Sequence, residues 1–209
     1  PRLRGGDVLS CRVEPIPSPM AEPLALYVHW PFCQSKCPYC DFNSHVVKSI
    51  DIDEWTTAYM NELEFSYQQT PNHQVQTIFF GGGTPSLMPP SLMGTIIDKV
   101  KSLWSCADNI EVTFEANPTS VEAEKFKAFK SAGANRVSIG IQAFNDADLK
   151  FLGRPHNLDE GIKAIRQHGP FQITGEAKLM QMMDTLLQAF VEQGRMKLPG
   201  SKYEPCYQV

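Results

Sequence analysis

The chain has 209 residues, of which 42% are hydrophobic, and a formal net charge of −4. It is long enough to bury one core. No Lys/Arg run exceeds two residues, which excludes a basic nucleic-acid surface. No apolar run approaches the roughly 18 residues of a membrane span, which excludes a transmembrane segment. Three of the six cysteines share one short loop and the others are scattered, so a secreted disulfide framework is excluded and a reducing compartment is expected.

Residues 1–23 differ in composition from the rest of the chain. They mix arginines with acidic residues, and prolines recur towards their end. This pattern predicts a disordered leader or linker, or at most a weak remnant of an organellar targeting segment.

From Leu24 onward, short apolar strands alternate with amphipathic helices. This rhythm is typical of an α/β fold with a parallel sheet. The expected strands are Leu24–Trp30, Gln76–Phe80, Ile110–Glu115 and Arg136–Gln142. The expected helices are Asp53–Tyr67, Ser91–Leu103, one that follows the capping box of Thr119 and Glu122 and stops at Gly133, and Leu158–Gln167.

The loop after the first strand holds the most specific motif, Cys33-Gln-Ser-Lys-Cys37-Pro-Tyr-Cys40. A C-x3-C-x2-C loop can hold three irons of a [4Fe–4S] cube and leave the fourth iron without a protein ligand. The aromatic residues around the loop would exclude water from such a cluster. They are Trp30, Phe32, Tyr39 and Phe42.

Two other interpretations of the cysteines stay open. His45 follows Cys40 by five residues, so three thiolates and an imidazole could close a structural zinc site. The thiols could also be buried and unliganded, although three of them in one polar loop would be an unusual way to fill a core.

Other unusual residues stand where the later strands end. Gly81-Gly82-Gly83-Thr84-Pro85 follows the second strand, Glu115 ends the third and Gln142 ends the fourth. Functional residues of (β/α) barrels lie at this end of the strands. The glycines predict close backbone approach to a ligand, with free N–H groups directed at anionic oxygens, but alone they are equally typical of a tight turn.

Several stretches together resemble the radical S-adenosylmethionine (SAM) superfamily. They are Tyr27-Val-His-Trp-Pro-Phe-Cys33, Phe80-Gly-Gly-Gly-Thr-Pro-Ser86, Glu111-Val-Thr-Phe-Glu-Ala-Asn-Pro118, Ser138-Ile-Gly-Ile-Gln-Ala-Phe-Asn145 and Leu152-Gly-Arg-Pro-His-Asn157. Within the superfamily they are similar to the oxygen-independent coproporphyrinogen III oxidase group, and to its HemW-like heme-chaperone branch in particular. The oxidase has a further cysteine where this chain has Phe42, which favours the chaperone branch.

The resemblance implies a partial (β/α) barrel of the radical SAM type over residues 24–169, with four βα units present and the C-terminal part missing. Cys33, Cys37 and Cys40 are the implied cluster ligands. In the family the open iron binds SAM, and one electron from the cluster cleaves it. The implied SAM contacts are Tyr27, Gly82, Gly83, Thr84, Glu115, Gln142 and Arg154. Two of these residues' roles have structural alternatives to SAM binding. Tyr27 could pack beneath the sheet, and Glu115 and Arg154 could form an ordinary ion pair.

Residues 170–209 depart from the family pattern. The next family strand, with an Asp-Leu-x-x-Gly-Leu-Pro motif, is replaced by an expected Met-rich helix that ends at Gly194 and by a polar tail. This predicts an unpaired edge on the fourth strand unless the tail covers it.

The implied function is a heme chaperone that binds a [4Fe–4S] cluster, SAM and heme, receives electrons from a donor and delivers heme to acceptor proteins. No nucleic-acid partner is expected. The expected location is the mitochondrion, with the cytoplasm as the alternative. The other candidate functions are a coproporphyrinogen oxidase-like enzyme of porphyrin biosynthesis and an inactive cluster-binding or zinc-binding fragment.

Overall fold

The computed structural model describes residues 21–118, 122–166 and 171–174. Within these ranges five strands form one sheet in the order β1-β2-β3-β4-β5, and every neighbouring pair is parallel. The strands are β1 (Glu22–Trp30), β2 (His73–Gly82), β3 (Ser105–Ala116), β4 (Arg136–Ile139) and β5 (Gln172–Thr174). The helices are α1 (Ile52–Gln69), the 3₁₀ turn η1 (Pro85–Leu87), α2 (Pro90–Leu103), α3 (Glu122–Ser131), α4 (Asp146–Phe151) and α5 (Leu158–Arg166).

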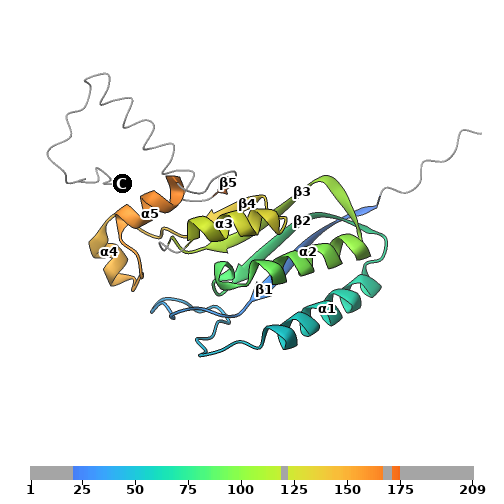
Figure 1. Cartoon of the computed structure of the whole chain (residues 1–209), viewed down its shortest axis with the longest axis horizontal. Helices are drawn as coiled ribbons and strands as arrows, with labels where there is room; N and C mark the ends of the chain where they lie inside the picture. Colours follow the sequence, from blue (N-terminus) through green and yellow to red (C-terminus); the bar gives the residue numbers. More distant parts are fainter. Residues whose placement is uncertain (1–20, 119–121, 167–170, 175–209) are drawn as a thin grey trace, which may run out of the picture.

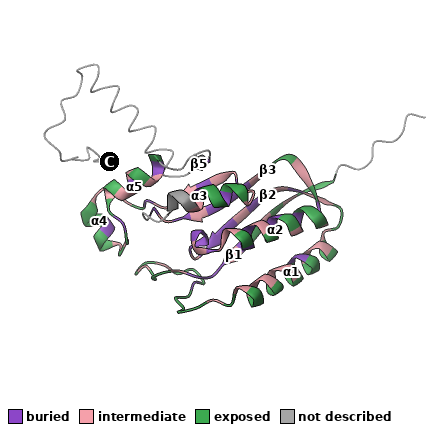
Figure 2. Ribbon diagram, in the orientation of Figure 1, coloured by how far each residue is buried: buried purple, intermediate pink, exposed green. Residues whose placement is uncertain are grey.

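Helices α1, α2 and α3 lie side by side along one face of the sheet (Figure 1). The strand register aligns Val28, Phe80, Phe114 and Val137 in one row, and all four are buried. Figure 2 shows buried residues, in purple, along the strands and exposed residues, in green, on the outer sides of the helices. Since side chains alternate along a strand, the neighbouring row that contains Tyr27 points to the opposite face. The helix-covered face is therefore the core, and the opposite face is free to carry polar groups.

The four expected strands and the α/β architecture are confirmed. Asp51 caps α1 by accepting a hydrogen bond from the Glu54 N–H at 3.0 Å. The fourth strand ends at Ile139, earlier than expected, because the backbone leaves the extended region and reaches φ 74° at Gln142. Helix α4 was not expected. The expected capping residue Thr119 and the Met-rich helix lie outside the described residues. Of the expected leader over residues 1–23, residues 1–20 also lie outside them, whereas Glu22 and Pro23 are not a leader but begin β1.

The edge of β4 is not left unpaired, because the segment after Gly169 covers it. Strand β5 pairs with β4, with Arg136 opposite Gln172 and Ser138 opposite Thr174. Phe171, directly before β5, is 3% exposed, and its ring centroid lies 5.6 Å from that of Phe114. The chain beyond Gly169 therefore contributes a strand and a core side chain.

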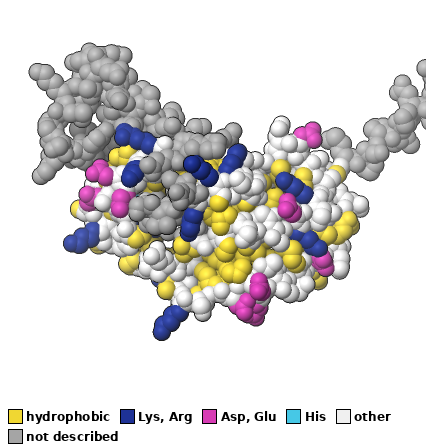
Figure 3. Space-filling view, in the orientation of Figure 1, with side chains coloured by type: hydrophobic (Ala, Val, Ile, Leu, Met, Phe, Trp, Pro, Cys, Tyr) yellow, Lys and Arg dark blue, Asp and Glu magenta, His cyan; other side chains and the backbone are white. Residues whose placement is uncertain are grey.

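On the face shown in Figure 3, basic and acidic side chains are interspersed, in agreement with the small net charge. No helix in the described part of the chain is long and apolar enough to span a membrane.

Candidate functional site

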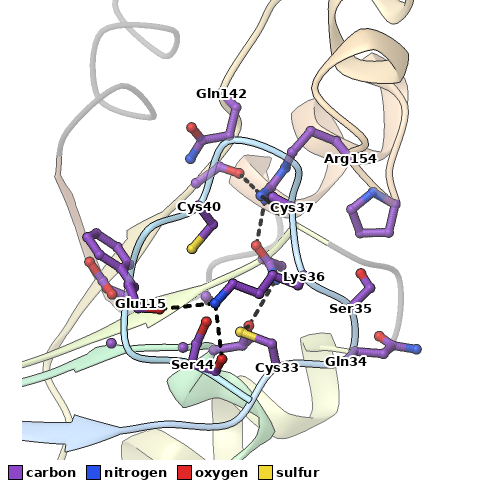
Figure 4. Close-up of a pocket in the computed structure, with 18 of the residues that line it drawn as sticks. Cys33, Gln34, Ser35, Lys36, Cys37, Cys40, Ser44, Glu115, Gln142 and Arg154 are labelled. Atoms are coloured by element: carbon purple, nitrogen blue, oxygen red, sulfur yellow. Dashed lines mark hydrogen bonds between the residues drawn. The ribbon is translucent and has the colours of Figure 1, made fainter. Parts of the chain in front are cut away.

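The carboxyl ends of the strands surround a cavity of about 480 Å³ (Figure 4). Since all strands are parallel, loops far apart in the sequence meet at this one edge of the sheet. The cavity brings together the three loop cysteines and six of the seven predicted SAM contacts. These six are Gly82, Gly83, Thr84, Glu115, Gln142 and Arg154.

The cysteine loop is held at its base by backbone hydrogen bonds. The Cys33 N–H donates to the His45 carbonyl at 3.0 Å, and the His45 N–H donates to the Pro31 carbonyl at 2.7 Å. Lys36 donates across the loop to the carbonyls of Phe42 and Ser44 at 3.2 and 3.3 Å. The loop is thus held by its own hydrogen bonds, and none of its three cysteines forms a disulfide.

Two of the three sulfurs accept hydrogen bonds from neighbouring segments. The Thr84 hydroxyl donates to Cys33 Sγ at 3.5 Å, and Arg154 Nη1 donates to Cys37 Sγ at 3.4 Å. Hydrogen bonds to the ligating sulfurs, and outer contacts that orient the ligands, are features of protein iron–sulfur sites. The surroundings of Cys33 and Cys37 therefore fit thiolate ligands of an iron–sulfur cluster.

The zinc alternative finds no support in this geometry. A tetrahedral zinc site needs its ligands to converge on one ion, and no three His, Cys, Asp or Glu side chains do so among the described residues. His45 Nε2 instead lies 3.0 Å from Asn43 Oδ1. A cube places its irons at separate corners, so thiolates that ligate it need not converge on one point.

The glycine turn is packed against the cysteine loop. The Gly83 N–H donates to the Trp30 carbonyl at 2.7 Å, and the Thr84 N–H donates to the Phe32 carbonyl at 2.8 Å. The Gly82 N–H donates to the Glu115 carboxylate. The prediction that this turn presents free N–H groups is therefore wrong for these three residues.

Steric contacts explain two of the glycines. A Cβ atom at Gly83 would lie 2.6 Å from the carbonyl oxygen of Phe32, and Gly82 has φ 111°, where side chains are strained. Only glycine lets the end of β2 approach the residue before Cys33 so closely.

Glu115, on β3, is half-buried at the cavity wall. Burial raises its pKa, and the hydrogen bond from Gly82 opposes part of this effect. Tyr27 lies outside the cavity lining, 59% exposed and stacked on Phe79, so it does not pack beneath the sheet. The pKa of Tyr27 is raised, first by burial and second by the negative charge of Glu115, which is close enough to act on the phenol.

Arg154 does not form the alternative ion pair with Glu115. Besides Cys37, its guanidinium donates to Tyr39 Oη at 3.4 Å, to Asn117 Oδ1 at 2.6 Å and to the Gly140 carbonyl at 3.1 Å. Gln142 also lines the cavity and has a positive φ of 74°, which is uncommon for a residue with a side chain.

Sequence reasoning gave no role to Asn117, although its motif is part of the resemblance. Its position directly after a strand that ends at the site is the one signal that could have identified it.

Comparisons with known proteins agree with this geometry. Residues 27–169 match the family described as the Radical SAM superfamily, and residues 156–209 match the family described as "Pyrimidine/purine nucleotide monophosphate nucleosidase, C-terminal". The second match lies mostly outside the described residues.

Among curated relatives, the chain is 44% identical to "Heme chaperone HemW" of Escherichia coli over 69% of this chain and 38% of that protein. It is 36% identical to "Radical S-adenosyl methionine domain-containing protein 1, mitochondrial" of Bos taurus, over 72% of this chain and 34% of that protein. A solved structure of the radical SAM enzyme coproporphyrinogen III oxidase from Escherichia coli, HemN, aligns with TM-score 0.64 and 24% identity over 70% of this chain and 34% of that chain. The likeness to this structure shows the fold. The matches cover less than two fifths of the length of each of these proteins.

Proposed function

Because the chain belongs to the radical SAM superfamily, we propose that Cys33, Cys37 and Cys40 ligate a [4Fe–4S] cluster whose open iron binds SAM. The observation that carries the proposal is the placement of these three cysteines around the cavity, with Thr84 and Arg154 donating to two of the sulfurs. When bound, the cluster supplies the electron that cleaves SAM.

The remaining cavity residues suit the polar parts of SAM. The Glu115 carboxylate can accept hydrogen bonds from ribose hydroxyl or ammonium groups, and the Arg154 guanidinium can pair with a carboxylate. Gln142, Gly82, Gly83 and Thr84 line the same cavity. We place Tyr27 at the outer edge of this site, beside Glu115. A cavity of about 480 Å³ lies within the usual size range of small-molecule sites.

We further propose a HemW-like role, in which the protein binds heme and delivers it to acceptor proteins. The support is the identity with bacterial heme chaperones and the phenylalanine at position 42, where the oxidase has cysteine. Phe42 lines the cavity and is 59% exposed. The mitochondrial location stays a prediction that rests on the names of the animal relatives.

Anaerobic reconstitution with iron and sulfide tests these proposals. We expect a broad brown absorbance, a change in the cluster spectrum on addition of SAM, and a separate absorption band on titration with heme. Stoichiometric zinc in anaerobically purified protein would favour the zinc-binding fragment. Decarboxylation of coproporphyrinogen III would favour the oxidase-like enzyme.

A further inference from the structure

The two side chains that donate to the cysteine sulfurs come from different parts of the chain. Thr84 follows β2, whereas Arg154 follows α4, and each must be oriented towards the cysteine loop. A hydroxyl rotor and a long guanidinium side chain both lose conformational freedom when fixed in this way. A group that bonds to both side chains would reduce this loss by fixing them together.

Asn117 lies between these two donors. Its Nδ2 donates to Thr84 Oγ1 at 3.4 Å, and its Oδ1 accepts from Arg154 Nη2 at 2.6 Å. An amide can donate at one end and accept at the other, and here both ends are used. The side chains form a continuous line from Cys33 through Thr84, Asn117 and Arg154 to Cys37.

We propose that Asn117 is a positioning residue that holds Thr84 and Arg154 against the sulfurs of Cys33 and Cys37. It thereby increases the retention of iron by the cysteine loop and raises the reduction potential of the cluster. This inference rests on the proposed cluster at these cysteines.

The direction of the effect follows from charge. One-electron reduction makes the cluster and its thiolates more negative, and hydrogen bonds to the sulfurs stabilise the more negative state. Without Asn117 the Thr84 hydroxyl can rotate away, and Arg154 keeps only its bonds to Tyr39, Gly140 and Cys37. The oxidised state is then favoured more than in the wild-type protein.

The chain offers a matched control in Asn135. Its amide also bonds two groups, accepting from the Val112 N–H at 2.9 Å and donating to the Ile110 carbonyl at 2.7 Å. These contacts involve the middle of β3 rather than its carboxyl end, and Asn135 does not line the cavity. Asn135→Leu therefore removes a comparable amide without touching the cysteines.

The test compares wild type, Asn117→Leu and Asn135→Leu of the full chain after anaerobic reconstitution. Iron retention is measured by competition with a chelator, and the potential by redox titration with dithionite as the electron donor. For Asn117→Leu we expect about 10-fold weaker retention, the lower end of the usual outer-shell effect. At the midpoint potential of the wild-type protein we expect about a threefold lower ratio of reduced to oxidised cluster. This ratio corresponds to a midpoint potential lower by about 28 mV, at 59 mV per tenfold change.

Asn135→Leu should lower the melting temperature while both cluster properties stay at wild-type values. If circular dichroism shows that Asn117→Leu does not fold, the smaller Asn117→Ala takes its place. Combining the substitution with Thr84→Val should shift the potential by less than the sum of the single changes, because both act on the Cys33 sulfur.

Two results would overturn this inference and leave the proposed function standing. One is wild-type iron retention and reduction potential in the Asn117 variant, and the other is equal shifts of both quantities in the Asn135 variant. Wild-type protein that takes up no cluster would overturn the proposed function together with it.

Discussion

Cys37 and Cys106 are both half-buried free thiols with different surroundings. Cys37 lines the cavity and accepts a hydrogen bond from Arg154, whereas Cys106 lies outside the cavity lining and burial raises its pKa. We expect Cys37→Ala to abolish the brown absorbance of reconstituted protein, because the cube loses an iron ligand. Cys106→Ala should retain it. Full absorbance in the Cys37 variant would contradict the ligand assignment.

The carboxyl group of Glu115 makes stability depend on pH. Its pKa is raised in the fold, so the protonated form stabilises the folded state below the ordinary carboxyl pKa of about 4.3. That stability is lost as the pH rises through the raised value. We therefore expect Glu115→Gln to raise the melting temperature of cluster-free protein at pH 8 more than at pH 4.

The exposed Glu62 of α1 provides the control for this measurement. Glu62→Gln should change the melting temperature little at either pH. A Glu115 variant that melts below wild type at pH 8 would show that the carboxylate stabilises the cluster-free fold.

At the scale of elements, the glycine turn and the cysteine loop behave as one unit. A Cβ atom at Gly83 would meet the backbone of Phe32 at 2.6 Å, so Gly83→Ala must displace the segment that leads into Cys33. We expect a loss of about 1–3 kcal/mol in the free energy of unfolding, as for other overpacked sites, together with weaker cluster uptake. Urea unfolding and reconstitution yield measure the two effects.

Gly94 in α2 is the matched control. A Cβ atom there would lie 3.6 Å from Ala132 Cβ, an ordinary contact. Gly94→Ala should therefore stabilise the protein by about 0.5–1 kcal/mol through its helix propensity. Cluster uptake by Gly83→Ala at the wild-type level would mean that the loop tolerates the displacement.

Strand β5 is tied to the core by Phe171, whose ring contacts Phe114 and Phe126 at centroid distances of 5.6 and 6.1 Å. Phe171→Ala should cost about 3–5 kcal/mol in urea unfolding, as expected for a buried aromatic side chain. Phe151→Ala removes the same atoms from a residue that is 86% exposed, and should change stability by less than about 0.5 kcal/mol. Equal effects of the two substitutions would place Phe171 outside the core.

The sequence predicted the elements better than it predicted the backbone details between them. Strands and α1–α2 follow from apolar periodicity, which depends on local residues. The pairing of β5 with β4, in contrast, is a contact between distant segments, and three residues carry too little pattern to predict it. Likewise, the cysteine motif predicts a cluster loop, but only the fold shows that the Trp30 and Phe32 carbonyls accept hydrogen bonds from the N–H groups of Gly83 and Thr84.

At the scale of the whole molecule, the parallel arrangement of the strands explains how a chain that matches 38% of the length of a relative can still assemble the cavity residues. Each strand delivers its carboxyl end to the same edge, so the cysteine loop, the glycine turn and Glu115 come from three successive strands. In the part of the chain that the structure describes, α1, α2 and α3 cover one face of the sheet, while Tyr27 on the other face is 59% exposed. The described strands and loops therefore form the cavity without a cover over Tyr27.

This arrangement predicts that the 209-residue chain on its own binds a cluster but cleaves SAM slowly and handles heme poorly. Tyr27 and Gln142 at the edges of the proposed SAM site are exposed, so bound SAM would stay accessible to water and loosely oriented. Because small misplacements of reacting groups cost roughly 100-fold in rate, we expect 5′-deoxyadenosine formation under dithionite at least about 100-fold below that of a full-length relative. Heme titration should likewise show weaker binding than the relative. Comparable values in either assay would mean that residues 170–209 complete the site.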